Sequence, residues 1–186
     1  IATAKVGALD SNDLIGLGSA QLGALSEGQF QQLTSTQVAA LSSAGLRGLA
    51  TGQVSALGTA KIAGLSSASV AALSSLQLIG FSTAQWALFA SNQIAALSSA
   101  AVAGLNTAQV DALSTMQLAA LSSVNIKGLS SSQLRIINTA KISALGAVDV
   151  AALLSAQLRG FSTTQLQQFN TAQVSSIASG AIMGLT

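Results

Sequence analysis

The chain of 186 residues contains no cysteine, histidine, proline or tyrosine, and only 6% of its residues are charged. Without cysteine there is no disulfide framework and no thiolate to act as a nucleophile or metal ligand. Without histidine, a nucleophilic serine lacks its commonest base, so we expect no enzyme and no catalytic residue. Seven Lys and Arg against five Asp and Glu give a net charge of +2. This charge is too small and too scattered for a surface that binds nucleic acid.

Long hydrophobic runs are also absent, although half of the residues are hydrophobic. Ser, Thr or Gln interrupts the apolar residues every few positions, and no run approaches the roughly 18 residues that a transmembrane helix needs. We therefore expect neither a membrane span nor a signal peptide within these residues. The acidic residues match no metal-binding spacing, so the sequence also predicts no metal site and no cofactor.

What the sequence does contain is an eight-residue repeat without insertion or deletion. Twenty-three octads, counted from Thr3, account for residues 3–186. Position four of each octad is a large apolar residue and position seven is Leu, Ile or Phe, so these two columns are the predicted core. Position six is mostly Ala or Gly, which indicates close backbone approach, and position five varies freely, which indicates exposure to solvent. The predicted core includes Val38, Leu41, Trp86, Phe89, Leu118 and Leu121.

Position eight of the octad determines the expected local structure, because it almost always holds a good helix N-cap residue. With the cap at position eight, the frequent Gln at position three falls at N3 and completes a capping box. The apolar residues at positions seven and four then form a hydrophobic staple across the cap. Each octad is therefore predicted to be one very short helix. The predicted caps include Asp10, Ser26, Thr34, Ser42, Ser66, Ser122 and Asn138.

A helix of about two turns cannot bury enough apolar surface to fold alone, so successive octads must pack on one another. We expect an all-α solenoid of about 23 very short helices, one per octad, with the two apolar columns inside. The segment TAKV at Thr3 recurs as TAKI at Thr59 and Thr139, and the offsets between successive copies are seven and ten octads. The difference between these offsets is three octads, which predicts about three octads per turn.

Two other folds have to be compared with this one. A continuous helix would place the apolar columns at a mean spacing of 4.0 residues, and its stripe would drift away from any partner within a few octads. A β-solenoid would need period-two alternation and many β-branched residues, whereas the octads are rich in Ala, Leu and Gln. The β-solenoid stays the alternative.

The whole chain, residues 1–186, is predicted to be a single uninterrupted solenoid. Ile1 and Ala2 fit positions seven and eight of a preceding octad, and no polar capping unit is recognisable at either end. Open solenoid ends expose core residues. We therefore expect either a segment of a longer array or a subunit that stacks end to end into a filament.

The octads resemble the octapeptide arrays, roughly [ST]-x-Q-[VIL]-x-[AG]-L-[ST], of large secreted or surface proteins of bacteria. STQVAALS at Ser35 and TAQVDALS at Thr107 carry the resemblance, which extends over the entire chain. Octads with Lys5, Lys61 or Lys141 in the Gln column, or with Asp13 or Asp149, depart from the pattern without breaking it. Proteins of this kind are often labelled haem-utilisation or adhesion proteins. The resemblance implies an extracellular or cell-surface protein that is exported by a dedicated secretion system.

These observations favour a structural or adhesive repeat protein that forms a stiff rod or a filament, with itself as the main partner and an unknown surface or host ligand. An ice-binding or other ligand-binding surface is the alternative, because a solenoid repeats Ser and Thr at regular intervals. Haem binding is a third hypothesis, but Met116 and Met183 are the only potential iron ligands of the usual types. An aromatic cluster around Trp86 could form an exposed adhesive patch, although Trp86 and Phe89 both occupy core columns.

Overall fold

Each octad of the chain forms one short helix in the computed structural model, which describes residues 2–182. Two compact units divide the chain, Ile1–Ala96 and Leu97–Thr186. The helices of the first unit are α1 (Thr3–Val6), α2 (Ser11–Ile15), α3 (Ser19–Gly23), α4 (Glu27–Gln31), α5 (Ser35–Ala39), α6 (Ser43–Leu46), α7 (Thr51–Ser55), α8 (Thr59–Ile62), α9 (Ser67–Ala71), α10 (Ser75–Leu78), α11 (Thr83–Trp86) and α12 (Ser91–Ala95).

The second unit continues the same eight-residue pattern. Its helices are α13 (Ser99–Ala103), α14 (Thr107–Asp111), α15 (Thr115–Ala119), η1 (Ile126–Gly128), α16 (Ser131–Arg135), η2 (Thr139–Ala144), α17 (Ala147–Ala151), α18 (Ser155–Leu158), α19 (Thr163–Leu166), α20 (Thr171–Ser176) and α21 (Ser179–Ile182), of which η1 and η2 are 3-10 helices. No strand occurs between residues 2 and 182. The all-α fold is therefore confirmed, and the alternative of a β-solenoid is wrong for this part of the chain.

Apart from η1, which begins at Ile126, the helices begin where the octad pattern places them, immediately after position eight. Asp10, Ser26, Thr34, Ser42 and Ser66 each accept a hydrogen bond from the backbone N–H three residues later. Where position three is Gln, its side chain commonly accepts a hydrogen bond from the N–H of the cap residue and completes the box. Even Ala50 and Leu154, which have no capping side chain, make this second bond: their N–H groups donate to the Oε1 atoms of Gln53 and Gln157.

Two of the predicted caps precede 3-10 helices instead of α-helices. Asn138 accepts from the N–H of Ala140, two residues on, and Ser122 lies 3.4 Å from the N–H nitrogen of Asn125. Both octads lack Gln at position three, where they carry Lys141 and Asn125. Lack of Gln does not by itself explain the 3-10 winding, because Lys61 occupies the same position in α8, which is an α-helix.

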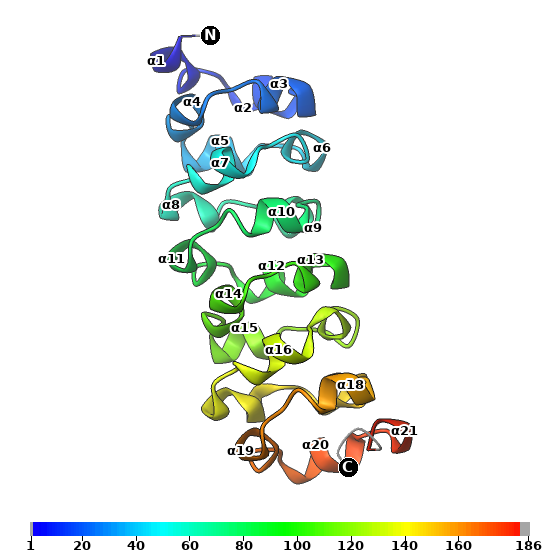
Figure 1. Cartoon of the computed structure of the whole chain (residues 1–186). Helices are drawn as coiled ribbons and strands as arrows, with labels where there is room; N and C mark the ends of the chain where they lie inside the picture. Colours follow the sequence, from blue (N-terminus) through cyan, green and yellow to red (C-terminus); the bar gives the residue numbers. More distant parts are fainter. Residues whose placement is uncertain (1, 183–186) are drawn as a thin grey trace. The chain divides into compact units, whose positions relative to one another are not determined.

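Packing between helices follows an interval of three octads within each unit. In the first unit α3 packs on α6 and α9 on α12, and in the second α13 packs on η1 and α17 on α20. Figure 1 shows α3 directly above α6, and α18 directly above α21. Side-chain hydrogen bonds between turns join residues 25 to 31 apart, so one turn contains slightly more than three octads. The predicted solenoid with about three octads per turn is confirmed.

The core consists of the two apolar columns. Val38 and Leu41 in the first unit and Leu118 and Leu121 in the second are all buried. Trp86 is 0% exposed and packs against Phe89 with ring centroids 4.9 Å apart, and Phe89 makes an edge contact with Phe81 at 5.0 Å. This aromatic cluster is therefore part of the core and does not form an exposed patch.

Small residues at position six permit close contact between turns. A Cβ atom on Gly160 would lie 2.6 Å from the carbonyl oxygen of Ser131, and one on Gly80 would lie 2.8 Å from that of Thr51. No residue in the described range has a positive φ angle, so backbone handedness does not require these glycines. They are needed because neighbouring backbones approach too closely for a side chain.

Removing a cap hydroxyl should lower the free energy of unfolding, whereas removing an exposed hydroxyl on the same helix should not. Ser162 accepts a hydrogen bond from the N–H of Gln165 at 3.2 Å, whereas Thr164 is exposed on the same helix. We expect Ser162→Ala to lower the free energy of unfolding by about 1 kcal/mol. Thr164→Ala should leave it unchanged or slightly higher, because Ala is the better helix former. Equal losses in urea unfolding of the two variants would contradict the cap assignment.

Candidate functional site

The glutamine column forms a hydrogen-bonded connection between turns. Gln37 is buried, and its Oε1 atom accepts a hydrogen bond of 2.7 Å from the N–H of Thr34. Its Nε2 atom donates across the turn to the carbonyl oxygens of Gly7, at 3.1 Å, and Leu9, at 2.7 Å. One side chain therefore caps its own helix and binds the backbone of the preceding turn. We call this arrangement, a position-three side chain that donates to backbone carbonyls of the preceding turn, the inter-turn clamp.

The same clamp recurs in both units with an unchanged register. In every case Nε2 donates to the carbonyl 28 residues earlier, which belongs to a position-seven residue. The clamps of this kind are Gln37, Gln53, Gln77, Gln85 and Gln93 in the first unit, and Gln133, Gln157, Gln165 and Gln173 in the second.

Burial makes these bonds important for stability. The position-three glutamines in the middle of each unit are almost inaccessible to water. A buried carbonyl that loses its donor costs about 1–3 kcal/mol, because water cannot replace the bond. Each clamp therefore joins two turns of the solenoid with bonds that are expensive to break.

Other residue types in the column show what the carbonyl groups accept. The Nζ atoms of Lys61 and Lys141 donate to the carbonyls of Gln31 and Asp111, both at 2.6 Å. Burial lowers the pKa of Lys61. Asn125 reaches the carbonyl of Leu97, again 28 residues earlier, at 3.5 Å. The common property of these three side chains is a hydrogen-bond donor.

The sequence analysis assigned the glutamines to capping alone and missed their second role. A signal for it was present in the composition of the column. Glutamate completes a capping box as well as glutamine does, yet position three contains Gln in most octads and Glu in none. An ionised carboxylate has no donor for the preceding turn, so the predominance of Gln fits a second contact that an amide can make.

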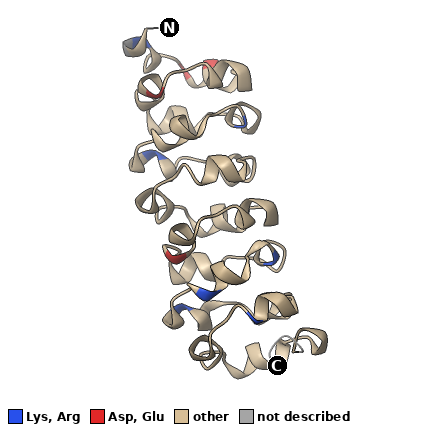
Figure 2. Cartoon of the chain, viewed as in Figure 1, with Lys and Arg blue, Asp and Glu red and all other residues tan. Residues whose placement is uncertain are grey.

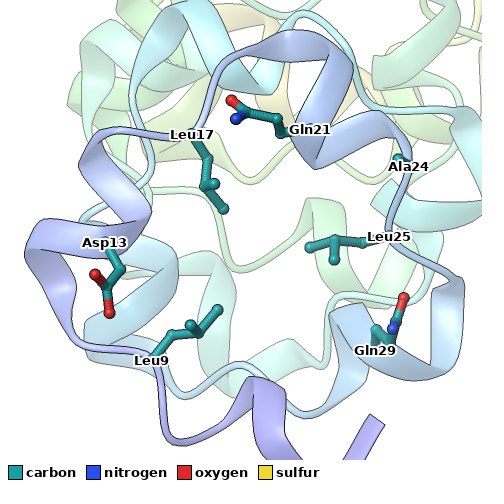
Figure 3. A pocket seen from close by; sticks show the side chains of 7 residues that line it. All are labelled: Leu9, Asp13, Leu17, Gln21, Ala24, Leu25 and Gln29. Carbon is teal, nitrogen blue, oxygen red and sulfur yellow. The ribbon is translucent and has the colours of Figure 1, made fainter. Parts of the chain in front are cut away.

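The face of the first turn is open, and the clamp column and the core are accessible there. Leu9, Leu17 and Leu25, all at position seven, point into a common cavity of about 400 Å³ that Asp13 and Gln21 also line (Figure 3). These three leucines are partly exposed, although position-seven leucines deeper in the unit are buried. Gln21 is exposed as well, and its Oε1 atom still accepts the N–H of Gly18 at 2.7 Å.

The last described turns of the second unit expose the other core column. Val174 and Ile182 occupy position four and are 54% and 48% exposed, whereas Val6 and Leu14 occupy the same column in the first turn and are fully buried. Position-four side chains are therefore covered by the following turn and position-three side chains by the preceding one, whereas position-seven side chains are partly exposed in both turns. The two kinds of open face are complementary in the same way as two successive turns.

Lys, Arg, Asp and Glu are few and scattered among the described residues (Figure 2). Position five, where Lys127, Arg135 and Arg159 lie, is exposed in every described octad. Several position-one hydroxyls bind the following turn: those of Ser35 and Ser131 donate to the carbonyls of Ala60 and Ala156. In the described range no helix has both the length and the apolar character that crossing a bilayer requires.

Of the two methionines considered for haem, the structure describes one. Met116 is 75% exposed at position two of its octad. Met183 lies outside the described residues.

Asp10 and Asp13 bind each other's backbone N–H groups, at 2.8 and 3.1 Å, and form a capping box at the start of the helix of the second octad.

Short helices, a two-column core and clamps at a fixed register define a solenoid repeat protein. Comparison with known families agrees: residues 6–43, 36–67 and 87–123 match the ALTTAQ repeat. These segments cover more than half of the chain, which therefore belongs to the ALTTAQ repeat family. No curated protein matches the chain significantly.

Proposed function

We propose that the chain is a non-enzymatic structural or adhesive repeat segment that acts outside the cell or on its surface. The observation that carries this proposal is the clamp, which ties each turn to the preceding one at the same register in both units. A repeat array joined in this way resists bending because every turn is bonded to its neighbour. Membership of the ALTTAQ repeat family supports an array as the functional unit. The resemblance to secreted surface proteins supports the extracellular location.

We further propose that copies of the chain associate end to end. The first turn offers exposed leucines and the amide of Gln21, and the last described turns offer exposed position-four side chains such as Val174. Such a contact joins two different faces, so it is heterologous and can continue into a filament. The low surface charge opposes association only weakly. The bonds made by Ser35 and Ser131 use hydroxyls that an ice-binding surface would have to present, which argues against that alternative.

Electron microscopy and sedimentation at several protein concentrations test the association. The expected result is filaments that lengthen with concentration, and Leu17→Lys should abolish them because it places a charge in the open core. Ile15→Lys is the matched control, since Ile15 lies on the outer face of the same octad and is exposed. Monomers at every concentration would refute self-association, and equal loss in both variants would refute the end face as the contact.

A further inference from the structure

Asp149 occupies a clamp position with a side chain that cannot clamp when it is ionised. It lies at position three of its octad and is only 9% exposed. Clamps in the neighbouring octads, such as Gln133, Gln157 and Gln165, all reach carbonyls 28 and 31 residues earlier. The same register places Asp149 opposite the carbonyls of Leu118 and Leu121. A carboxylate and a carbonyl are both acceptors, so the ionised side chain cannot bond there.

A protonated carboxyl group has the donor that the position requires. Asn125, in an octad three earlier, shows that a side chain of this length suffices. Its Oδ1 atom accepts the N–H of Ser122, and its Nδ2 atom lies 3.5 Å from the carbonyl of Leu97. Asp149 already makes the first of these bonds, since its carboxyl group accepts the N–H of Gly146. A proton on the second oxygen would reproduce the pattern of Asn125.

We propose that Asp149 is a proton-dependent inter-turn clamp, which closes onto the carbonyl of Leu121 when its carboxyl group is protonated and opens when that group is ionised. The consequence is local. At acid pH this octad is held like its glutamine-bearing neighbours, and at neutral pH it lacks their bond to the preceding turn.

The surroundings favour the protonated form. Burial raises the pKa of Asp149, and the hydrogen bond from Gly146 opposes the increase only in part. Helix α20, which packs on α17, has no ionisable side chain, and neither has the segment 115–121. Lys141, in the preceding octad, is bound to the carbonyl of Asp111, and Lys127 and Arg159 are exposed at position five.

The direction of the pH effect follows from linkage. Because the pKa is higher in the folded than in the unfolded chain, the folded state binds the proton more tightly. The stabilisation is complete below the unfolded pKa and is lost as the pH rises through the raised folded pKa. Amide exchange around residues 118–121 and 146–153 should therefore quicken toward neutral pH beyond the intrinsic chemical effect.

The test compares the wild-type chain with Asp149→Asn, Asp149→Gln and the control Asp111→Asn between pH 3 and 7, by thermal unfolding and by NMR titration of the carboxyl groups. We expect the midpoints of wild type and Asp149→Asn to diverge as the pH rises, with wild type the less stable at neutral pH. Asp111→Asn, which changes an exposed position-five residue, should follow the wild-type profile.

Three outcomes would overturn the proposal. The first is a constant difference between wild type and Asp149→Asn across the pH range. The second is a carboxyl titration of Asp149 at or below the ordinary value. The third is protection at residues 118–121 that does not respond to pH in wild type, or that responds equally in Asp149→Gln, where the amide donor is permanent.

Discussion

A Gln53→Glu protein is expected to unfold with a free energy about 3–5 kcal/mol below that of wild type at neutral pH. The substitution preserves the size of the side chain and the oxygen that accepts the N–H of Ala50. It replaces the Nε2 donor by a charged oxygen, which then faces the carbonyls of Leu22 and Leu25, 2.9 and 2.5 Å from the original nitrogen. A buried charge among acceptors has no compensating partner, so the loss exceeds that of one hydrogen bond.

The matched control is Gln21→Glu in the same column. Gln21 caps its own helix but is exposed on the open face of the first turn, where Asp13 already places an acid in this column. A glutamate at N3 is favourable near a helix N-terminus, so its effect on the free energy of unfolding should lie within about 0.5 kcal/mol of zero. Urea unfolding monitored by circular dichroism measures both variants. A similar loss in the two would mean that capping, and not the contact between turns, explains the column.

Trp86→Ala should lower the free energy of unfolding by about 3–5 kcal/mol. Trp86 is fully buried between turns, and its ring meets that of Phe89, which in turn contacts Phe81. Truncation leaves a cavity that the small residues of neighbouring octads cannot fill, because the backbone of each turn is held by its clamps.

Leu88→Ala, two residues away, is the control for Trp86→Ala. Leu88 occupies position six but is 48% exposed, so its truncation removes little buried area. Its effect should stay below about 1 kcal/mol. Thermal unfolding followed by circular dichroism provides the comparison. If Leu88→Ala proved as damaging as Trp86→Ala, the aromatic cluster would not be the centre of this part of the core.

Much of the fold was predictable because its determinants are local. Caps such as Ser26 and core residues such as Val38 follow from which side chains can satisfy a helix N-terminus and which avoid water, and the strict octad makes both columns visible. The number of octads per turn was harder to predict from the sequence, because it depends on how the backbones of residues far apart in the chain pack together. Its approximate value came from repeated segments, while the register of 28 residues came only from the structure.

The clamp was the main feature that sequence reasoning did not reach. Gln37 satisfies the rule for a capping box, and that explanation is complete as long as the preceding turn is not considered. Only the position of the carbonyls of Gly7 and Leu9 reveals that the amide nitrogen has a separate partner. Asp149 illustrates the same point, because an acid at N3 is unremarkable in an isolated helix and becomes significant only opposite another backbone.

The register of the clamp has a consequence for how such arrays can change in length. Twenty-eight residues is three and a half octads, so each clamp joins position three of one octad to position seven of an earlier octad. If one octad were deleted anywhere between two partners, each remaining position-three side chain would still find a position-seven carbonyl 28 residues earlier. Recombination within the coding sequence can thus lengthen or shorten the array in steps of eight residues, without having to add or remove a whole turn.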